Sequence, residues 1–325
     1  MDRGVLVARF VGWTSLTVLM AFLFNDFLTY WCGWPGAVRL TGDASDLRAW
    51  FQAGLYAAAV LLALSYVSWR RQRSLDAERK LVFAINSFLI RAAFWAVLLI
   101  GIVDFGLAFL RGEGLLAWAV GDVLADRLIR AEFRGAYVHM SLVAASIPIA
   151  AFTRSIGISW LALLIVVVEL LMVIFRFIFS YEQDYMADLV RFWYAALFML
   201  GCAYTLRQEG HVRIDVAYTH FTTRGKSLVN VLGTLLLGMP FCWLILVFGM
   251  SGRTGIINSA LLTYEIEGLG NGLYVFYLMT VFMGLFAISM LVEFVAFLFG
   301  AVADYQGRPD RRVHDGSPVQ SSSGQ

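Results

Sequence analysis

The stretch GCAYTLRQEGHVRIDVAY, residues 201–218, sets the interpretation of the whole chain. Its apolar run carries no charge before Arg207, the polar patch RQEGHVR follows, and an amphipathic segment comes next. This order is typical of a transmembrane helix that reaches the cytoplasmic surface, after which the chain turns along the membrane face. The stretch therefore indicates a helical membrane protein.

The composition agrees with that interpretation. Hydrophobic residues make up 60% of the 325 residues and charged residues only 15%, against roughly 25% charged in soluble domains. The mean hydropathy is +0.74. Apolar residues come in blocks of about 20, the length that crosses a ~30 Å hydrocarbon core. The blocks predict an all-α, polytopic transmembrane bundle of about eight spans, at 8–30, 50–69, 82–109, 133–153, 158–179, 187–206, 227–250 and 272–299.

The positions of Lys and Arg orient these spans. With a cytoplasmic amino terminus, the inner segments hold 15 of the 25 Lys and Arg residues and the outer segments hold seven. Because cytoplasmic loops carry the excess of positive charge, both termini are predicted to be cytoplasmic. Four of the outer arginines, Arg134 among them, lie in segment 111–134. Its pattern predicts an amphipathic helix that lies on the membrane surface.

The sequence lacks the motifs of catalytic and metal sites. No HExxH motif, nucleophile elbow or phosphate-binding glycine loop occurs, and the three cysteines lie far apart. A haem held between helices needs paired histidines at membrane depth, and only His139 falls inside a predicted span. We therefore assign no catalytic residue, no cofactor, no metal site and no nucleic-acid partner.

Charged residues inside the spans are the next candidates, since they are costly in lipid and usually face protein or water. Glu169 and Arg176 lie seven residues apart on one helix face, and Arg176 could pair with Asp184 or Asp188 beyond the end of the span. One interpretation is an ion or proton path; the other is a set of interhelical or subunit contacts. We favour contacts, because the charges do not converge at one depth and no span is broken at the midplane.

The polar patch adds further candidates. Charges of both signs alternate over a few residues and could form a local charge network, in which a histidine titrates near neutral pH; the residues are Arg207, Glu209, His211, Arg213 and Asp215. The simpler interpretation is that these residues end a helix and hold a loop. Residues 214–222, IDVAYTHFT, fit an interfacial segment better than a ninth span.

Three parts follow one another along the chain. We expect a four-span amino-terminal extension at 1–153, four spans with the polar patch at 154–303, and a polar, disordered cytoplasmic tail at 304–325. No clear internal repeat relates the two halves. Pro148 and Pro240 fall inside spans, where proline can kink a helix.

Residues from about 154 to 300 resemble the small membrane subunit, of DctQ type, of tripartite ATP-independent periplasmic (TRAP) transporters. The resemblance rests, in this order, on FRFIFS at 175–180, DYMADLVRF at 184–192, GCAYTLRQEGHVRID at 201–215 and the SGRTG loop at 251–255. Ala187 and Asp188 stand where the family commonly has two adjacent glutamates. The preceding ~150 residues look like the longer variant of this subunit, which has extra amino-terminal helices.

The resemblance implies a subunit without a substrate site of its own. In this family a large permease binds substrate and sodium and moves by an elevator motion, the small subunit braces its scaffold, and a periplasmic binding protein delivers the solute, often a carboxylate. It also implies a multi-pass protein of the bacterial inner membrane, in contact with lipid. A stand-alone channel or carrier and a membrane anchor of a redox complex stay open as alternatives. The candidate subunit-interface or structural residues are Glu169, Arg176, Asp188, Arg207, His211, Arg213 and Asp215.

Overall fold

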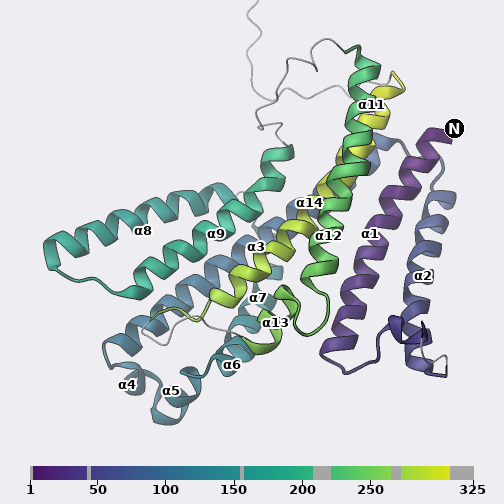
Figure 1. The fold of residues 1–325 in the computed structure, drawn as a ribbon. Coiled ribbons are helices and arrows are strands. Elements are labelled where there is room, and N and C mark those ends of the chain that lie inside the picture. Colours follow the sequence, from purple (N-terminus) through teal and green to yellow (C-terminus); the bar gives the residue numbers. More distant parts are fainter. Residues whose placement is uncertain (1–2, 42–44, 154–156, 208–220, 265–271, 308–325) are drawn as a thin grey trace, which may run out of the picture.

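The fold is known from a computed structural model that describes residues 3–41, 45–153, 157–207, 221–264 and 272–307. Every regular element within these ranges is a helix (Figure 1). In chain order the elements are α1 (Arg3–Tyr30), η1 (Ala37–Thr41), α2 (Leu47–Trp69), α3 (Leu75–Gly112), α4 (Leu116–Val120), α5 (Asp122–Leu128), α6 (Ala131–Phe133), the π-helix η2 (Arg134–His139), α7 (Met140–Phe152), α8 (Ile158–Phe179), α9 (Asp184–Arg207), α11 (Thr223–Gly233), the π-helix η3 (Thr234–Gly238), α12 (Met239–Gly249), α13 (Ile256–Thr263) and α14 (Phe276–Tyr305).

Eight helices of the described ranges are long and apolar enough to cross a membrane. The predicted all-α, polytopic bundle of eight spans is therefore confirmed. Each predicted span overlaps one of these helices, and the largest difference is at α3, which begins at Leu75 rather than at residue 82. The helix is longer because its first turn is polar and well capped. The hydroxyl of Ser74 accepts from the backbone N–H of Ala77, and acidic side chains occupy the first turn.

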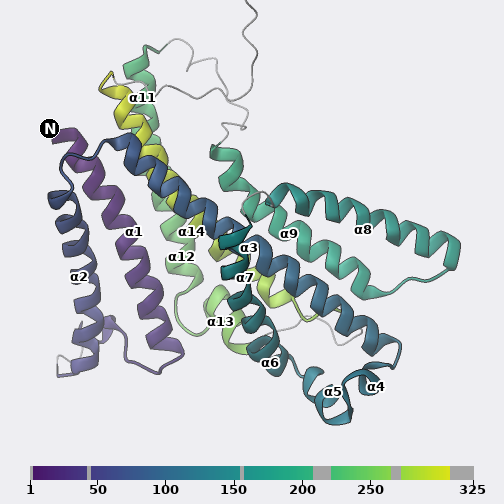
Figure 2. The ribbon, with the colours of Figure 1, turned by 180° about the vertical axis from the view of Figure 1, so that it is seen from behind.

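Helix α14 lies at the centre of the bundle. Of its most apolar stretch, 61% is buried, and it contacts α1, α3, α9, α11, α12 and α13. Figures 1 and 2 show the α1–α2 pair on one side of it and the α8–α9 pair on the other. Helices α3 and α7 cover α14 from the side that faces the viewer in Figure 2. Helices α1, α3, α9 and α12 therefore pack directly on the last one, and α2, α7 and α8 pack mainly on α1, α3 and α9.

The two predicted parts of the chain share their cores. One cluster of buried side chains joins Phe94 of α3 to Leu161 of α8, Phe192 of α9 and Phe282 of α14. A second joins α1, α3, α12 and the other half of α14. In lipid, such contacts stabilise the bundle through close van der Waals packing rather than through removal of water. The described residues before 154 and those after 156 therefore pack as one bundle, although the sequence divides there.

A buried ion pair fastens the α1–α2 pair to α3. The guanidinium of Arg9 donates from Nε to Glu78 Oε2 (2.9 Å) and from Nη2 to the backbone carbonyl of Arg70 (2.8 Å). The side chains of Arg9 and Glu78 are both 0% exposed. Since breaking a buried pair leaves a buried charge, this contact fixes where α1 meets the start of α3.

The segment after α3 differs from the prediction. In place of one amphipathic helix over 111–134, the structure has two short helices, α4 and α5, that are separated at Gly121, followed by α6. Gly121 has a φ of +82°, a conformation that glycine adopts without steric cost and that ends α4. Arg134, predicted at the membrane surface, is instead fully buried at the start of the π-helix η2.

The two prolines have different surroundings. Pro148 lies inside α7, which continues on both sides of it. Pro240 is the second residue of α12, just after η3, a turn with i→i+5 hydrogen bonding. Since proline supplies no N–H to the helix, a wide turn next to Pro240 is an adjustment that keeps the span continuous.

Candidate functional site

A fully buried polar centre joins α3, η2 and the start of α14. The carboxylate of Asp104 accepts from Arg134 Nη1 (3.2 Å) and from His139 Nε2 (3.1 Å) through its Oδ1 atom. Its Oδ2 atom accepts from the backbone N–H of Tyr274 (2.8 Å). The side chains of all three charged or titratable groups are 0% exposed. The carboxylate is thus compensated within the chain, as a buried charge must be.

The hydrogen bonds define which nitrogen of His139 carries a proton. A carboxylate only accepts, so the proton that faces Asp104 sits on Nε2. The other ring nitrogen, Nδ1, lies 2.7 Å from the hydroxyl of Tyr277, which can donate to it. The chain Tyr277–His139–Asp104 therefore connects α14 to α3 through η2.

The π-helix η2 explains why Arg134 and His139 reach the same carboxylate. They are five residues apart, and in an α-helix such side chains point about 140° away from each other. The i→i+5 repeat of a π-helix brings them to one side. Gly135 makes room beside them: a Cβ atom there would overlap the ring of Tyr264, which packs edge-on against Tyr277.

Three charged side chains hold the backbone just before α14. Besides the Asp104 bond to Tyr274, Asp188 Oδ2 of α9 accepts from the N–H of Leu273 (3.2 Å), and Arg111 Nη2 donates to the carbonyl of Gly272 (2.7 Å). The guanidinium groups of Arg111 and Arg134 lie 4.7 Å and 4.1 Å from the centre of the Tyr274 ring. Gly272 has no space for a side chain, because a Cβ would lie 2.5 Å from Asp188 Oδ2. The backbone that leads into α14, residues 272–274, is therefore held against α3 and α9.

A further polar contact crosses from α3 to the middle of α14. The amide of Asn86 donates from Nδ2 to Glu293 Oε2 (2.7 Å) and to the carbonyl of Ser289 (3.0 Å). Asn86 and Glu293 are both buried. Such bonds hold helices together in lipid, where apolar side chains give no preference for one neighbour over another.

An apolar cavity of about 390 Å³ lies among α3, α7, α9, α13 and α14. Two serines line it, and both use their hydroxyls locally: Ser146 donates to the carbonyl of Val143 (2.7 Å) and Ser289 to that of Phe286 (3.1 Å). Its other lining residues are apolar. A polar solute therefore finds little to bind in this cavity.

A second space of about 390 Å³ is a cleft between α8 and the start of α9. The predicted residues Glu169 and Arg176 line it, and both are exposed. Arg176 pairs with Glu182 (Nε to Oε2, 3.4 Å). The expected pairing with Asp184 or Asp188 is wrong, because the residue after α8, Ser180, has a φ of +48° and the turn that follows brings Glu182 back to the helix.

Tyr181, in the same turn, connects this cleft to the end of α3. Its hydroxyl donates to Glu113 Oε1 and lies 2.6 Å from the hydroxyl of Tyr185. The hydrogen bond to the Glu113 carboxylate raises the pKa of the Tyr181 hydroxyl above its ordinary value.

The other predicted residues lie in two different places. Asp188 is buried and also faces Arg191 Nη1 (3.3 Å). Arg207 ends α9, where Nη1 donates to Ser87 Oγ (2.6 Å) and the guanidinium lies 4.5 Å from the centre of the Phe83 ring, both on α3. His211, Arg213 and Asp215 lie outside the residues that the structure describes. The four described candidates thus do not form one site.

The sequence reasoning missed the polar centre itself. It treated Arg134 as an outer arginine and His139 only as a lone histidine in a span. The one signal in the sequence was that Arg134 and His139 lie near the start of a predicted span, 133–153, that carries no other charge. Within the described ranges, no group of three or more histidine, cysteine, aspartate or glutamate side chains could hold a metal ion.

Residues 165–300 match the family model for "Tripartite ATP-independent periplasmic transporters, DctQ component". No curated protein and no solved structure matches the chain. The matched range begins within α8 and ends within α14, so it includes Arg176, Asp188 and Arg207 and leaves α1 to α7 outside. DctQ components work with a large permease and a substrate-binding protein, and they are not a family of enzymes. Residues 165–300 of this multi-pass membrane protein accordingly match a DctQ domain, a component of TRAP transporters.

Proposed function

We propose that the chain is the small permease subunit of a TRAP transporter in a bacterial inner membrane. It braces the immobile scaffold of a large, elevator-type permease, which takes up an organic solute, a carboxylate, in a sodium-coupled reaction. A periplasmic binding protein supplies the solute. The observation that carries this proposal is the match of residues 165–300 to the DctQ component. Residues 1–153 are an extension of the subunit, and both termini face the cytoplasm.

The internal contacts support a bracing role. A brace must keep its shape while its partner moves, and polar contacts between helices restrict sliding. The Asp104 and Glu78 pairs and the Asn86–Glu293 bond tie α3 to η2, α1 and α14. The cavity among α3, α7 and α14 has an almost wholly apolar lining, which suits packing better than binding of a carboxylate.

The first test asks what the chain assembles with. A tagged chain purified from its own host in mild detergent should bring down a large polytopic permease in constant stoichiometry. Purification of the chain alone from membranes that contain the permease contradicts the proposal. A Soret absorbance band in the purified protein points instead to the anchor of a redox complex.

The second test asks what transports. Proteoliposomes should take up a labelled carboxylate only when they hold both membrane subunits and receive the binding protein and an inward sodium gradient. Vesicles with this chain alone should show no uptake. Uptake by those vesicles contradicts the proposal and identifies a stand-alone carrier.

A further inference from the structure

Helix α8 is the least covered span of the described chain. Only 11% of its most apolar stretch is buried, against 61% for α14. Figures 1 and 2 both show it at the outer edge of the bundle, beyond α9. Leu161 and Ile165 are buried on the side toward α9, and most of the remaining side chains are large, apolar and exposed. Such a surface suits lipid, and by itself it calls for no protein partner.

Glu169 makes the surface unsuitable for lipid. It is the twelfth of 22 residues in α8, so it sits at the middle of the span, and it is exposed. Within the described part of the chain, no hydrogen bond or ion pair reaches its carboxylate. A charge at the centre of a transmembrane helix costs about 2.5–3.5 kcal/mol on insertion scales, which is why such residues face protein or water.

The surroundings of Glu169 form a shaped recess. It shares the cleft of about 390 Å³ with Arg176, two turns along α8, and with Glu182 and Asp184 in the segment that leads into α9. The charged lining thus consists of three acids and one base, and the base already pairs with Glu182. The side chains of that pair are 62% and 61% exposed. The cleft is complementary to a basic group at the depth of Glu169.

A second copy of the chain does not supply that group. Copies inserted in the same orientation pair about an axis along the membrane normal, so Glu169 of one faces Glu169 of the other at the same depth. Like charges in contact repel each other. A phospholipid does not supply it either, because its phosphate is an anion and lies at the membrane surface rather than at the midplane.

We propose that the Glu169 side of α8 is the docking surface for a transmembrane helix of the large permease, and that this helix carries a lysine or arginine at the depth of Glu169. This inference rests on the proposed function. The basic side chain enters the cleft and pairs with Glu169, and apolar side chains of the same helix pack on Val173 and Met172 beside it. The pair is desolvated on both sides, so it selects one helix register against others.

Site-specific photocrosslinking tests the location. A benzoylphenylalanine at Val173 lies in the cleft, and the same group at Leu171 lies on the other side of α8, about 160° away. Both positions are apolar and exposed, at 52% and 44%. In the complex of both subunits, Val173 should give an adduct with the large permease in several-fold higher yield than Leu171. Equal yields, or an adduct between two copies of this chain, overturn the proposal.

Charge substitution tests the chemistry. Glu169→Lys should reduce the amount of permease that co-purifies, and Glu169→Gln should reduce it less. Leu171→Lys, which adds a positive charge on the opposite side, controls for the cost of a lysine in the span and should reduce the amount of permease less than Glu169→Lys does. Full retention of the permease by Glu169→Lys overturns the proposal. Substitution of the matching lysine or arginine of the permease by glutamate should restore its complex with the Glu169→Lys chain.

The outcomes separate the two proposals. If the unsubstituted chain co-purifies with the permease but neither the cleft adduct nor the charge effect is found, this inference fails and the proposed function stands. If the unsubstituted chain brings down no permease, the proposed function fails.

Discussion

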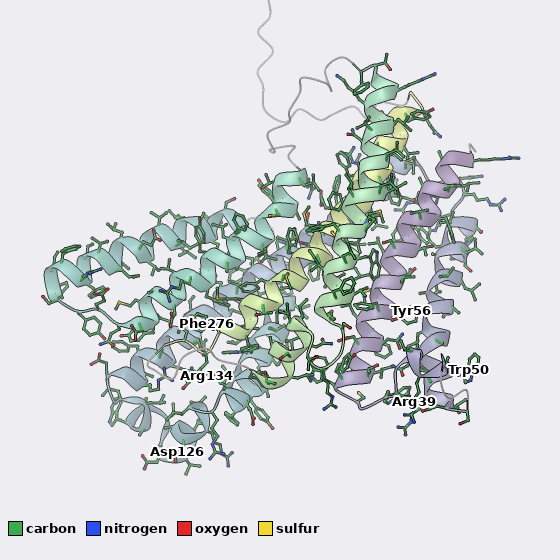
Figure 3. All side chains as sticks on the ribbon, in the orientation of Figure 1. Arg39, Trp50, Tyr56, Asp126, Arg134 and Phe276 are labelled. Atoms are coloured by element: carbon green, nitrogen blue, oxygen red, sulfur yellow. The ribbon has the colours of Figure 1, made fainter. Side chains whose placement is uncertain are left out.

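At Asp104 a single carboxylate accepts hydrogen bonds from two side chains and one backbone N–H, all without access to water. Asp104→Ala leaves Arg134 buried without its counter-charge, and loss of such a partner costs about 3–5 kcal/mol. We expect a correspondingly lower stability in a titration with SDS in mixed micelles. The control is Asp126→Ala on α5, an exposed residue at the rim of the molecule (Figure 3), which should leave the midpoint unchanged. Equal effects of the two substitutions contradict the role given to Asp104.

The Arg9–Glu78 pair is a different case, because both partners can be replaced together. Arg9→Met alone leaves Glu78 buried and unpaired, and we expect a loss of about 3–5 kcal/mol. Addition of Glu78→Leu removes the orphaned charge and should restore most of that stability. The four proteins of this double-mutant cycle can be compared in the same SDS titration. If the double variant is no more stable than Arg9→Met, the pair does more than compensate charge.

At the scale of single residues, the sequence indicates which side chains are unusual but not which of them meet. Glu169 and Arg176 stand out because they interrupt an apolar run. Asp104 and Arg134 are 30 residues apart, and their contact depends on the π-helix η2, which aligns Arg134 with His139. The same ambiguity led to the wrong partners for Arg176, since the choice among nearby acids is made by the turn at Ser180.

At the scale of elements, close approach of α3 and α9 depends on Gly101. A Cβ at this position would overlap Trp193 and lie 3.0 Å from Leu189 Cδ1. Gly101→Ala should therefore destabilise the protein by about 1–3 kcal/mol through overpacking. Gly106→Ala on the same helix meets nothing within 4 Å and should be neutral or slightly stabilising, because alanine favours helix more than glycine. Thermal unfolding in detergent gives the comparison. A lower Tm for both variants argues that glycine is needed along α3 for another reason.

Spans could be predicted from the sequence because each is a long apolar block, and length alone separates such a block from other elements. The segment 111–134 could not, because its hydrophobic pattern continues through Gly121 while the backbone turns there. The π-helices η2 and η3 leave no periodic signal. Their extra residue per turn is stabilised by contacts from other helices, such as Asp104 at η2.

At the scale of the whole molecule, the DctQ domain depends on helices that lie outside it. Removal of residues before 157 takes away α3, so Glu293 loses Asn86 and the backbone before α14 loses Arg111 and Asp104. We expect residues 157–325 to aggregate in size-exclusion chromatography. A second fragment, residues 73–325, keeps α3 and carries Glu78→Gln because it lacks Arg9, the partner of Glu78. It should remain monodisperse, with a lower Tm than the full chain. A well-folded 157–325 fragment shows that the domain stands by itself.

The central position of α14 has a consequence for synthesis. Of the eight described spans it is the last to leave the ribosome, so the other seven enter the bilayer before the helix that α1, α3, α9 and α12 contact exists. Until then Asn86 lacks Glu293 of α14, and Asp104 lacks the N–H of Tyr274 in the backbone that leads into it. Assembly of the described bundle is therefore completed only after α14 has been made, and a nonsense codon ahead of Phe276 leaves α1, α3, α9 and α12 without the helix on which they pack.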